Sequence, residues 1–178
     1  NPSAARAGGH WAEYGRVFRH HPVENVSWQE FRSALVALGM SFPTEAQLEY
    51  GIRGGTKTAS WWEERVPFDV EQMVYLGRET FHWPVGSGPA NDFGLHHCTG
   101  NVWELCKEPY AQTLGEGVEF LPGTGELVAV NASLNRRTIR GGSYATRLVE
   151  LRSARRVPIE EAKGRHSVGV RPARAIER

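Results

Sequence analysis

The clearest pattern in the chain is an amphipathic segment near residue 30. Five apolar side chains recur there at three- and four-residue spacing and share one helical face: Trp28, Phe31, Ala34, Leu35 and Leu38. Ser27 and Glu30 have the spacing of a capping box, and Gly39 follows the last apolar position. The pattern therefore predicts a short helix that starts after Ser27 and ends near Gly39.

A second helix is predicted almost at once. Thr44 is placed to cap its first turn, with Gln47 three residues later to complete a second capping box. Leu48 and Ile52 continue the apolar face, and the run from Arg53 to Gly55 ends it with two glycines.

The rest of the chain has little periodicity. Thr56–Val85 carries several tryptophans without a regular pattern, so we expect long packed loops there, and we expect a further loop over 107–125. Four short segments have the composition of strands: 102–106, Leu127–Val130, Thr138–Arg140 and Ser167–Arg171. Two helices and a few short strands are therefore expected, joined by long loops.

Composition and charge exclude several classes of protein. The 178 residues hold 21 lysines and arginines against 20 acidic residues, which gives no basic excess for nucleic acid or an anionic membrane. No apolar run approaches the ~18 residues that a membrane span needs. The 20 glycines exceed the usual ~7% and agree with many turns. We expect one domain, with neither nucleic acid nor a membrane span among its partners.

The cysteine content bears on the compartment. Cys98 and Cys106 are too few for a disulfide framework. Two unpaired thiols in a reducing compartment are the simpler interpretation and favour the cytoplasm, while a single disulfide stays open. The chain begins at Asn1 without a methionine or a signal-peptide pattern, so its native N-terminus is expected to lie elsewhere.

Candidate functional residues are most concentrated in the stretch from Arg140 to Arg156. Gly141 and Gly142 follow a short apolar strand, where close backbone approach or a positive φ excludes larger residues. Three arginines then follow within five residues, separated by small side chains: Arg152, Arg155 and Arg156. This spacing favours internal pairs with carboxylates. We expect the segment between the glycines and the arginines to form the functional surface.

These and other motifs resemble one known family. The matching stretches occur in the family's order: His21–Trp28, Phe42–Tyr50, Asn91–Leu95, Gly100–Glu104, Arg140–Tyr144 and Gly169–Arg171. The chain resembles the superfamily of formylglycine-generating enzymes and sulfatase-modifying factors, whose fold is related to that of C-type lectins. The resemblance implies an α+β fold with little regular secondary structure, made of two short helices and short antiparallel strands. The resemblance covers roughly Pro22 to Arg174.

The resemblance implies a domain over residues 22–178, preceded by a linker or irregular arm over residues 1–21. The family's usual N-terminal strands have no counterpart in the chain. Either they lie in another piece of the polypeptide, where they or a fused protein would be a partner of this domain, or the protein is a shortened relative. The resemblance also implies structural roles for six residues: Trp103, Arg140, Gly141, Gly142, Arg152 and Arg156. Arg152 and Arg156 are expected to be buried in ion pairs, with Glu104 as a partner.

The family's oxidases use two cysteines just beyond the Gly-Gly-Ser-Tyr motif, which bind copper. The corresponding positions here are Thr146 and Leu151. Neither side chain supplies a thiolate, which is the species that binds a soft metal or attacks a substrate. We therefore favour a non-catalytic domain. The alternative is an oxidoreductase of the same superfamily, of the formylglycine-generating or the hercynine-oxygenase type.

A binding role is the preferred interpretation. The resemblance places a ligand surface, for a protein or a small ligand, on seven consecutive residues: Tyr144, Ala145, Thr146, Arg147, Leu148, Val149 and Glu150. One subset of relatives consists of variable proteins of diversity-generating retroelements, which diversify this segment. Other relatives are fused to or partnered with proteases or kinases.

Calcium is the one cofactor that the resemblance offers. The family's site uses the turn at Gly100, Val102 and Glu104, through main-chain oxygens and a carboxylate, as a hard cation prefers. His97 stands where the family usually has Asn or Asp, which removes one oxygen. The other interpretation of Glu104 is a structural ion pair with an arginine.

Overall fold

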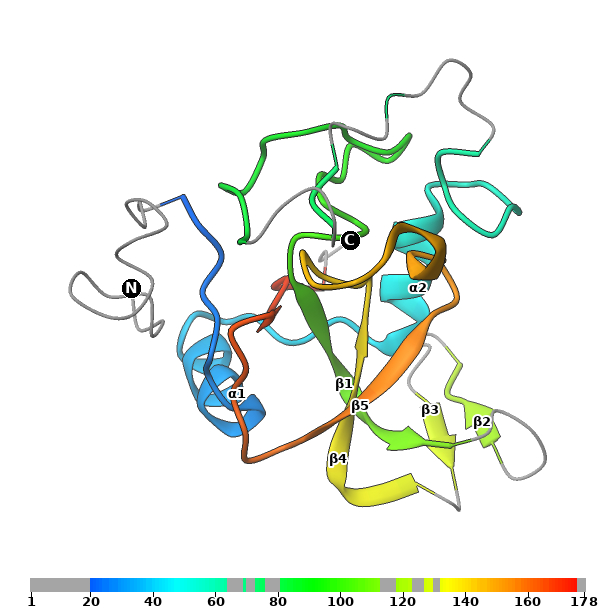
Figure 1. The fold of residues 1–178 in the computed structure, drawn as a ribbon. Helices are drawn as coiled ribbons and strands as arrows, with labels where there is room; N and C mark the ends of the chain where they lie inside the picture. The colour runs from blue at the N-terminus through cyan, green and yellow to red at the C-terminus, as the bar shows by residue number, and fades with distance from the viewer. Residues whose placement is uncertain are drawn as a thin grey trace.

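The computed structural model describes residues 20–63, 69, 73–75, 81–112, 118–122, 127–129 and 132–175. Its elements lie in the order α1 (Trp28–Ala37), α2 (Glu45–Arg53), β1 (Trp103–Ala111), β2 (Val118–Phe120), β3 (Leu127–Ala129), β4 (Ala132–Arg140), the 3₁₀ turn η3 (Leu148–Glu150), β5 (Arg156–Glu160) and β6 (Val168–Gly169) (Figure 1). Nearly all of the arm expected over residues 1–21 lies outside the described residues.

Both helices form where the sequence predicts them. Ser27 and Glu30 make the two reciprocal hydrogen bonds of a capping box on α1, and Thr44 and Gln47 do the same on α2. Gly54 ends α2 in the left-handed conformation, with a φ of 57°. Because each cap satisfies backbone N–H groups that the helix leaves unpaired, these helix starts are set locally.

The main sheet has four strands in the order β5-β4-β1-β6. β1 and β4 are antiparallel, with Glu104 opposite Arg140, whereas β6 runs parallel to β1. β2 and β3 form a separate two-stranded sheet. The fold is α+β, as expected, but the main sheet is mixed instead of purely antiparallel.

Three strand predictions need correction. The loop expected over 107–125 contains the second half of β1 and all of β2, and β4 begins six residues before Thr138. β5 was not predicted, because its charged ends and Pro158 hide the alternation. A proline is compatible with this strand because β5 lies at the edge of the sheet.

The main core lies between α1 and the sheet. Trp28, Phe31 and Leu35 of α1 pack against side chains from every strand of the sheet: Trp103, Leu105, Ile139, Ile159 and Val168. Burial of side chains this large stabilises the fold by about 1.5–3 kcal/mol each. A smaller cluster joins Leu48 and Ile52 of α2 to the two cysteines. The loop after α2 is also packed inward, since Trp61 is buried and donates to the Thr99 hydroxyl at 2.9 Å.

Within the residues that the model describes, neither helix is long and apolar enough to cross a bilayer.

Candidate functional site

The loop that follows β4 forms the centre of the candidate site. Gly141 and Gly142 have φ values of 88° and 79°, so both lie in the left-handed region that favours glycine. A Cβ atom on Gly142 would overlap the Leu151 side chain and lie 3.5 Å from Thr146. Thr146 and Leu151 therefore lie against the same glycine, although five positions separate them in the sequence.

Contacts with two other loops hold this loop in place. The Ser153 N–H donates to the Ala59 carbonyl at 2.8 Å, and the Ser60 hydroxyl donates to the Leu151 carbonyl at 3.0 Å. On the opposite side, the Tyr144 N–H donates to the Asn101 carbonyl at 2.8 Å. The loop is thus a fixed part of the domain, packed against segments that are far away in the sequence.

The seven residues predicted to bind a ligand are not all on the surface. Ala145, Arg147 and Val149 are exposed, and Val149 has 77% of its surface accessible. Leu148 and Glu150 are half-buried. Tyr144 and Thr146 are buried, which corrects the prediction of one continuous surface. Exposed positions alternate with buried ones because the loop rests on the two glycines and on Leu151.

The buried members of the segment have structural contacts. The Thr146 Oγ1 atom accepts a hydrogen bond from the Ser143 N–H at 3.0 Å. The Tyr144 ring lies 6.1 Å from the Phe81 ring and 6.4 Å from the His82 ring, centroid to centroid. Burial, with a smaller contribution from the Glu24 carboxylate, raises the pKa of Tyr144. The phenol is therefore neutral at physiological pH.

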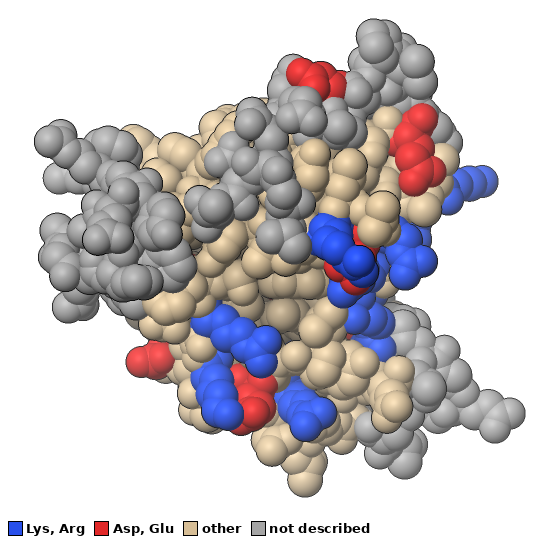
Figure 2. Space-filling model, viewed as in Figure 1, with Lys and Arg blue, Asp and Glu red and all other residues tan. Residues whose placement is uncertain are grey.

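Charge on the loop surface is mostly basic. The Glu150 carboxylate forms two ion pairs, with the Nη1 atom of Arg155 at 3.0 Å and with the Nε atom of Arg147 at 3.4 Å. Two guanidinium groups therefore share one carboxylate. Basic side chains gather on this face of the molecule, beside the loop (Figure 2). The surface thus offers alternating small, cationic and apolar groups at Ala145, Arg147 and Val149.

An ion-pair cluster lies beneath the loop. The Glu45 carboxylate accepts from Arg140 at 2.7 Å and from Arg156 at 2.6 Å, and Arg140 also contacts Glu49 at 2.8 Å. Burial alone raises the pKa of Glu45, but hydrogen bonds from Arg156 and the charge of Arg140 hold it below its usual value. The cluster joins the first turn of α2 to β4 and β5.

The expected partners of the arginines are partly wrong. Arg156 is paired as predicted, but with Glu45 instead of Glu104. The prediction that Arg152 is buried and paired is wrong, because its side chain is exposed. Glu104 pairs with Arg171, whose Nη2 and Nε atoms reach the two carboxylate oxygens at 2.7 and 2.9 Å. The short intervals between arginines in the sequence could not identify carboxylates that lie far away along the chain.

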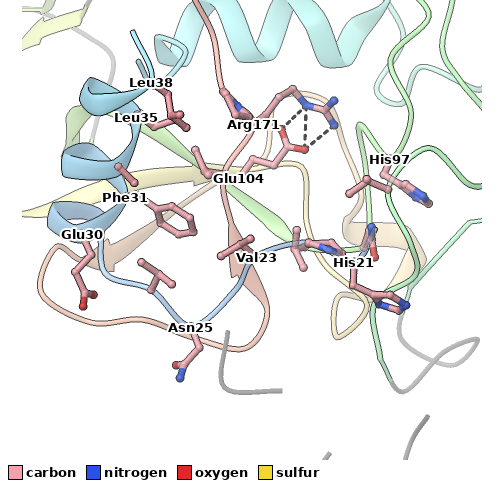
Figure 3. Close-up of a pocket in the computed structure, with 18 of the residues that line it drawn as sticks. His21, Val23, Asn25, Glu30, Phe31, Leu35, Leu38, His97, Glu104 and Arg171 are labelled. Atoms are coloured by element: carbon pink, nitrogen blue, oxygen red, sulfur yellow. Dashed lines mark hydrogen bonds and ion pairs between the residues drawn. The ribbon is translucent and has the colours of Figure 1, made fainter. Parts of the chain in front are cut away.

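A cavity that the sequence did not predict opens beside α1. Its volume is about 760 Å³, and its apolar wall comes from α1, from the segment that precedes α1 and from the segment after β6. Figure 3 shows Phe31, Leu35 and Leu38 on one side, His21 and His97 on the far side, and the Glu104–Arg171 pair between them. The one sequence feature that could have indicated the cavity was the wide apolar face of α1, whose side chains contact both the core and the cavity.

Comparison with known proteins identifies the family. The protein-family model described as "Sulfatase-modifying factor enzyme 1-like domain" matches residues 3–176. The chain belongs to this family. The resemblance found in the sequence motifs is therefore confirmed.

Relatives within the family include active and inactive enzymes. A "Formylglycine-generating enzyme" of Streptomyces coelicolor is 32% identical over 142 residues, which cover 70% of this chain and 42% of that protein. An "Inactive C-alpha-formylglycine-generating enzyme 2" of Bos taurus is 29% identical, covering 65% and 42%. The "Serine/threonine-protein kinase pkn1" of Chlamydia caviae is 29% identical, covering 90% and 25%. The chain thus spans less than half the length of these relatives.

Solved structures support the same fold. "Treponema denticola variable protein 1" superimposes with a TM-score of 0.76 at 20% identity, covering 97% of this chain and 76% of that one. "PvdO from Pseudomonas aeruginosa" superimposes with a TM-score of 0.73 at 20% identity, covering 91% and 65%. At this identity the likeness establishes the fold.

The sulfatase-modifying-factor domain of this chain lacks thiols at the loop. The whole chain has two cysteines, and both are buried in the cluster with α2. Burial raises the pKa of Cys98 to about 12 and that of Cys106 well above its usual value. Both side chains are at most 2% exposed, so neither thiol is accessible at the surface of the loop.

The residues expected to bind calcium do not fit a cation. Both oxygens of Glu104 accept hydrogen bonds from Arg171, so a guanidinium group occupies the space where an ion would bind. Gly100 and Val102 are both buried. Within the described ranges, no three His, Cys, Asp or Glu side chains are grouped as metal ligands.

Proposed function

We propose that this domain is a non-catalytic binding module of the sulfatase-modifying-factor family. One observation carries the proposal: Thr146 and Leu151, at the positions of the family's catalytic cysteines, lie together against Gly142. The place where copper would be held is filled by a hydroxyl group and an aliphatic side chain. Neither is a ligand for a soft metal ion.

The binding surface that we propose consists of Ala145, Arg147 and Val149. These side chains are exposed, while the backbone beneath them is held by Gly142, Thr146 and Leu151. A rigid backbone with exposed side chains suits recognition, because little conformational entropy is lost on binding. The name of the treponemal variable protein, which shares the fold, agrees with a role in which such a loop varies.

A turnover assay tests the absence of catalysis. The protein is loaded with copper(I) and incubated with a cysteine-containing peptide of the sulfatase type, and mass spectrometry measures formylglycine. The Streptomyces coelicolor relative serves as the active control. We expect no product from this chain. Formylglycine above the peptide-only background would establish the oxidoreductase alternative instead.

A matched pair of variants tests the binding surface. Val149→Glu places a charge in the proposed surface, and Leu134→Glu places the same charge at a site on β4 that is 99% exposed. Quantitative capture from a lysate of the source organism should yield a protein or small ligand that the first variant loses and the second retains. Equal retention by both variants would exclude this surface.

A variable protein is the more specific form of this proposal. In that case, alleles from closely related genomes should differ at Ala145, Arg147 and Val149 and keep Thr146 and Leu151, because the last two support the loop. Substitutions spread evenly over the loop would instead favour a fixed module. In a fixed module, the similarity to the chlamydial kinase would suggest a partner on the same or an associated polypeptide.

A further inference from the structure

We propose that the cavity beside α1 binds an uncharged small molecule with an apolar body and a hydroxyl or amide group at one end. The cavity is separate from the loop after β4, so this inference does not depend on the proposed binding surface. Its volume of about 760 Å³ is within the range of roughly 300–1,000 Å³ that small-molecule sites have.

The apolar wall determines the body of the ligand. Val23, Val26 and Val170 pack on the main core but are only partly buried, so each keeps apolar surface toward the cavity. Leu38 and Val85, also in the lining, are 68% and 57% exposed. Covering these side chains removes apolar surface from water, which is the main favourable contribution to binding at such a site.

Two of the three charged groups in the lining compensate each other, and the third points away from the cavity. Glu104 and Arg171 form a bidentate pair, so together they carry no net charge. At the rim, Glu30 accepts hydrogen bonds from the Ser27 N–H and hydroxyl group at 2.9 and 2.6 Å, and Figure 3 shows its carboxylate directed away from the cavity. A charged ligand group would enter without a counter-ion and lose its hydration.

His97 on the far side provides a neutral hydrogen-bonding group. His97 Nε2 lies 3.2 Å from the Pro84 carbonyl oxygen, which only accepts, so Nε2 carries the proton and Nδ1 is an acceptor. Burial lowers the pKa of His97 to about 4, so its ring is neutral at pH 7. An acceptor nitrogen of this kind favours a ligand that donates a hydrogen bond without carrying a charge.

Three eight-carbon probes separate the ligand classes. The protein of residues 1–178 is labelled with ¹⁵N and titrated at pH 7 with 1-octanol, octanoate and octylammonium, while amide shifts are recorded. We expect 1-octanol to shift the amides of Leu35, Leu38 and Val170 and to bind at least tenfold more tightly than either ion. Equal or tighter binding of an ion, or shifts confined to other parts of the chain, would overturn the proposal.

Two tryptophan variants of one helix provide the control. Ala34 lies in the cavity lining and is exposed, so Ala34→Trp should obstruct the cavity without disturbing the core. Val36 is also exposed on α1 but is absent from this lining, so Val36→Trp adds the same ring elsewhere. We expect 1-octanol binding to weaken at least tenfold in the first variant and to change less than twofold in the second. Unchanged binding in Ala34→Trp would contradict the assignment.

Discussion

Arg140 and Glu45 form a buried ion pair, in which the Nη2 atom of Arg140 lies 2.7 Å from the Oε1 atom of Glu45 and both side chains are only 2% exposed. The residues are 95 positions apart, so the pair joins the first turn of α2 to the end of β4. Arg140 also donates to the Ser153 carbonyl at 3.2 Å, beneath the loop that carries the proposed surface. The pair therefore holds that loop in position.

Loss of one member of this pair should strongly destabilise the domain. Arg140→Ala leaves the Glu45 carboxylate buried with one guanidinium group fewer, and removal of one member of a buried pair costs about 3–5 kcal/mol. Urea unfolding followed by tryptophan fluorescence measures this change. Arg152→Ala is the control, because Arg152 is exposed, and it should change the unfolding free energy by less than about 0.5 kcal/mol. Equal effects of the two substitutions would contradict the structural role of the pair.

Thr146 should contribute to stability through its hydroxyl group. Thr146→Val keeps the shape but removes the acceptor for the buried Ser143 N–H, which should cost about 1–3 kcal/mol in the free energy of unfolding. Thr146→Ser retains the hydroxyl group and should lose less. The same urea titration compares the three proteins. If valine were as stable as threonine, the hydrogen bond would have no net effect.

The two cysteines should resist alkylation in the folded protein. Burial raises the pKa of Cys98 to about 12, and both side chains are at most 2% exposed. Iodoacetamide at pH 8 should modify neither residue within an hour, and both should react once urea unfolds the chain. Mass spectrometry of tryptic peptides measures each site separately. Rapid modification of native Cys98 would contradict the burial and would reopen thiol chemistry.

Acid should destabilise the domain through histidines that are buried in their neutral form. Burial lowers the pKa of His97 from 6.5 to about 4 and that of His82 to about 3. The unfolded chain therefore binds protons that the folded state does not, so stability is complete above about pH 6.5 and falls as the pH decreases toward 4. Each such proton contributes about 1.4 kcal/mol per pH unit to the slope.

His97→Asn isolates one of these protons. His97 has a φ of 51°, a conformation that asparagine adopts readily, so the substitution removes the titrating ring without backbone strain. Unfolding free energies measured between pH 7 and pH 5 should show a slope that is smaller by up to one proton at the acid end, or up to ~1.4 kcal/mol per pH unit. An unchanged slope would mean that His97 is protonated in the folded state as readily as in the unfolded chain.

Local chemistry made some features predictable. The two helices and their caps follow from side chains three residues apart, such as Ser27 with Glu30 and Thr44 with Gln47. The sequence pattern did not predict β5, because this strand is defined by its antiparallel pairing with β4 and not by an alternation of its own residues. Arg152 was placed wrongly because spacing alone does not show which of several neighbouring arginines faces inward.

The sequence by itself determined the capped helices, the family and the absence of cysteine at positions 146 and 151, because each is a matter of residue identity at short range. Only the tertiary structure decided that Glu45 pairs with Arg140 and Arg156, that Glu104 pairs with Arg171, and that Thr146 is buried while Val149 is exposed. It also created the cavity beside α1. These features depend on contacts between segments that are distant along the chain, and packing of the whole domain sets such contacts.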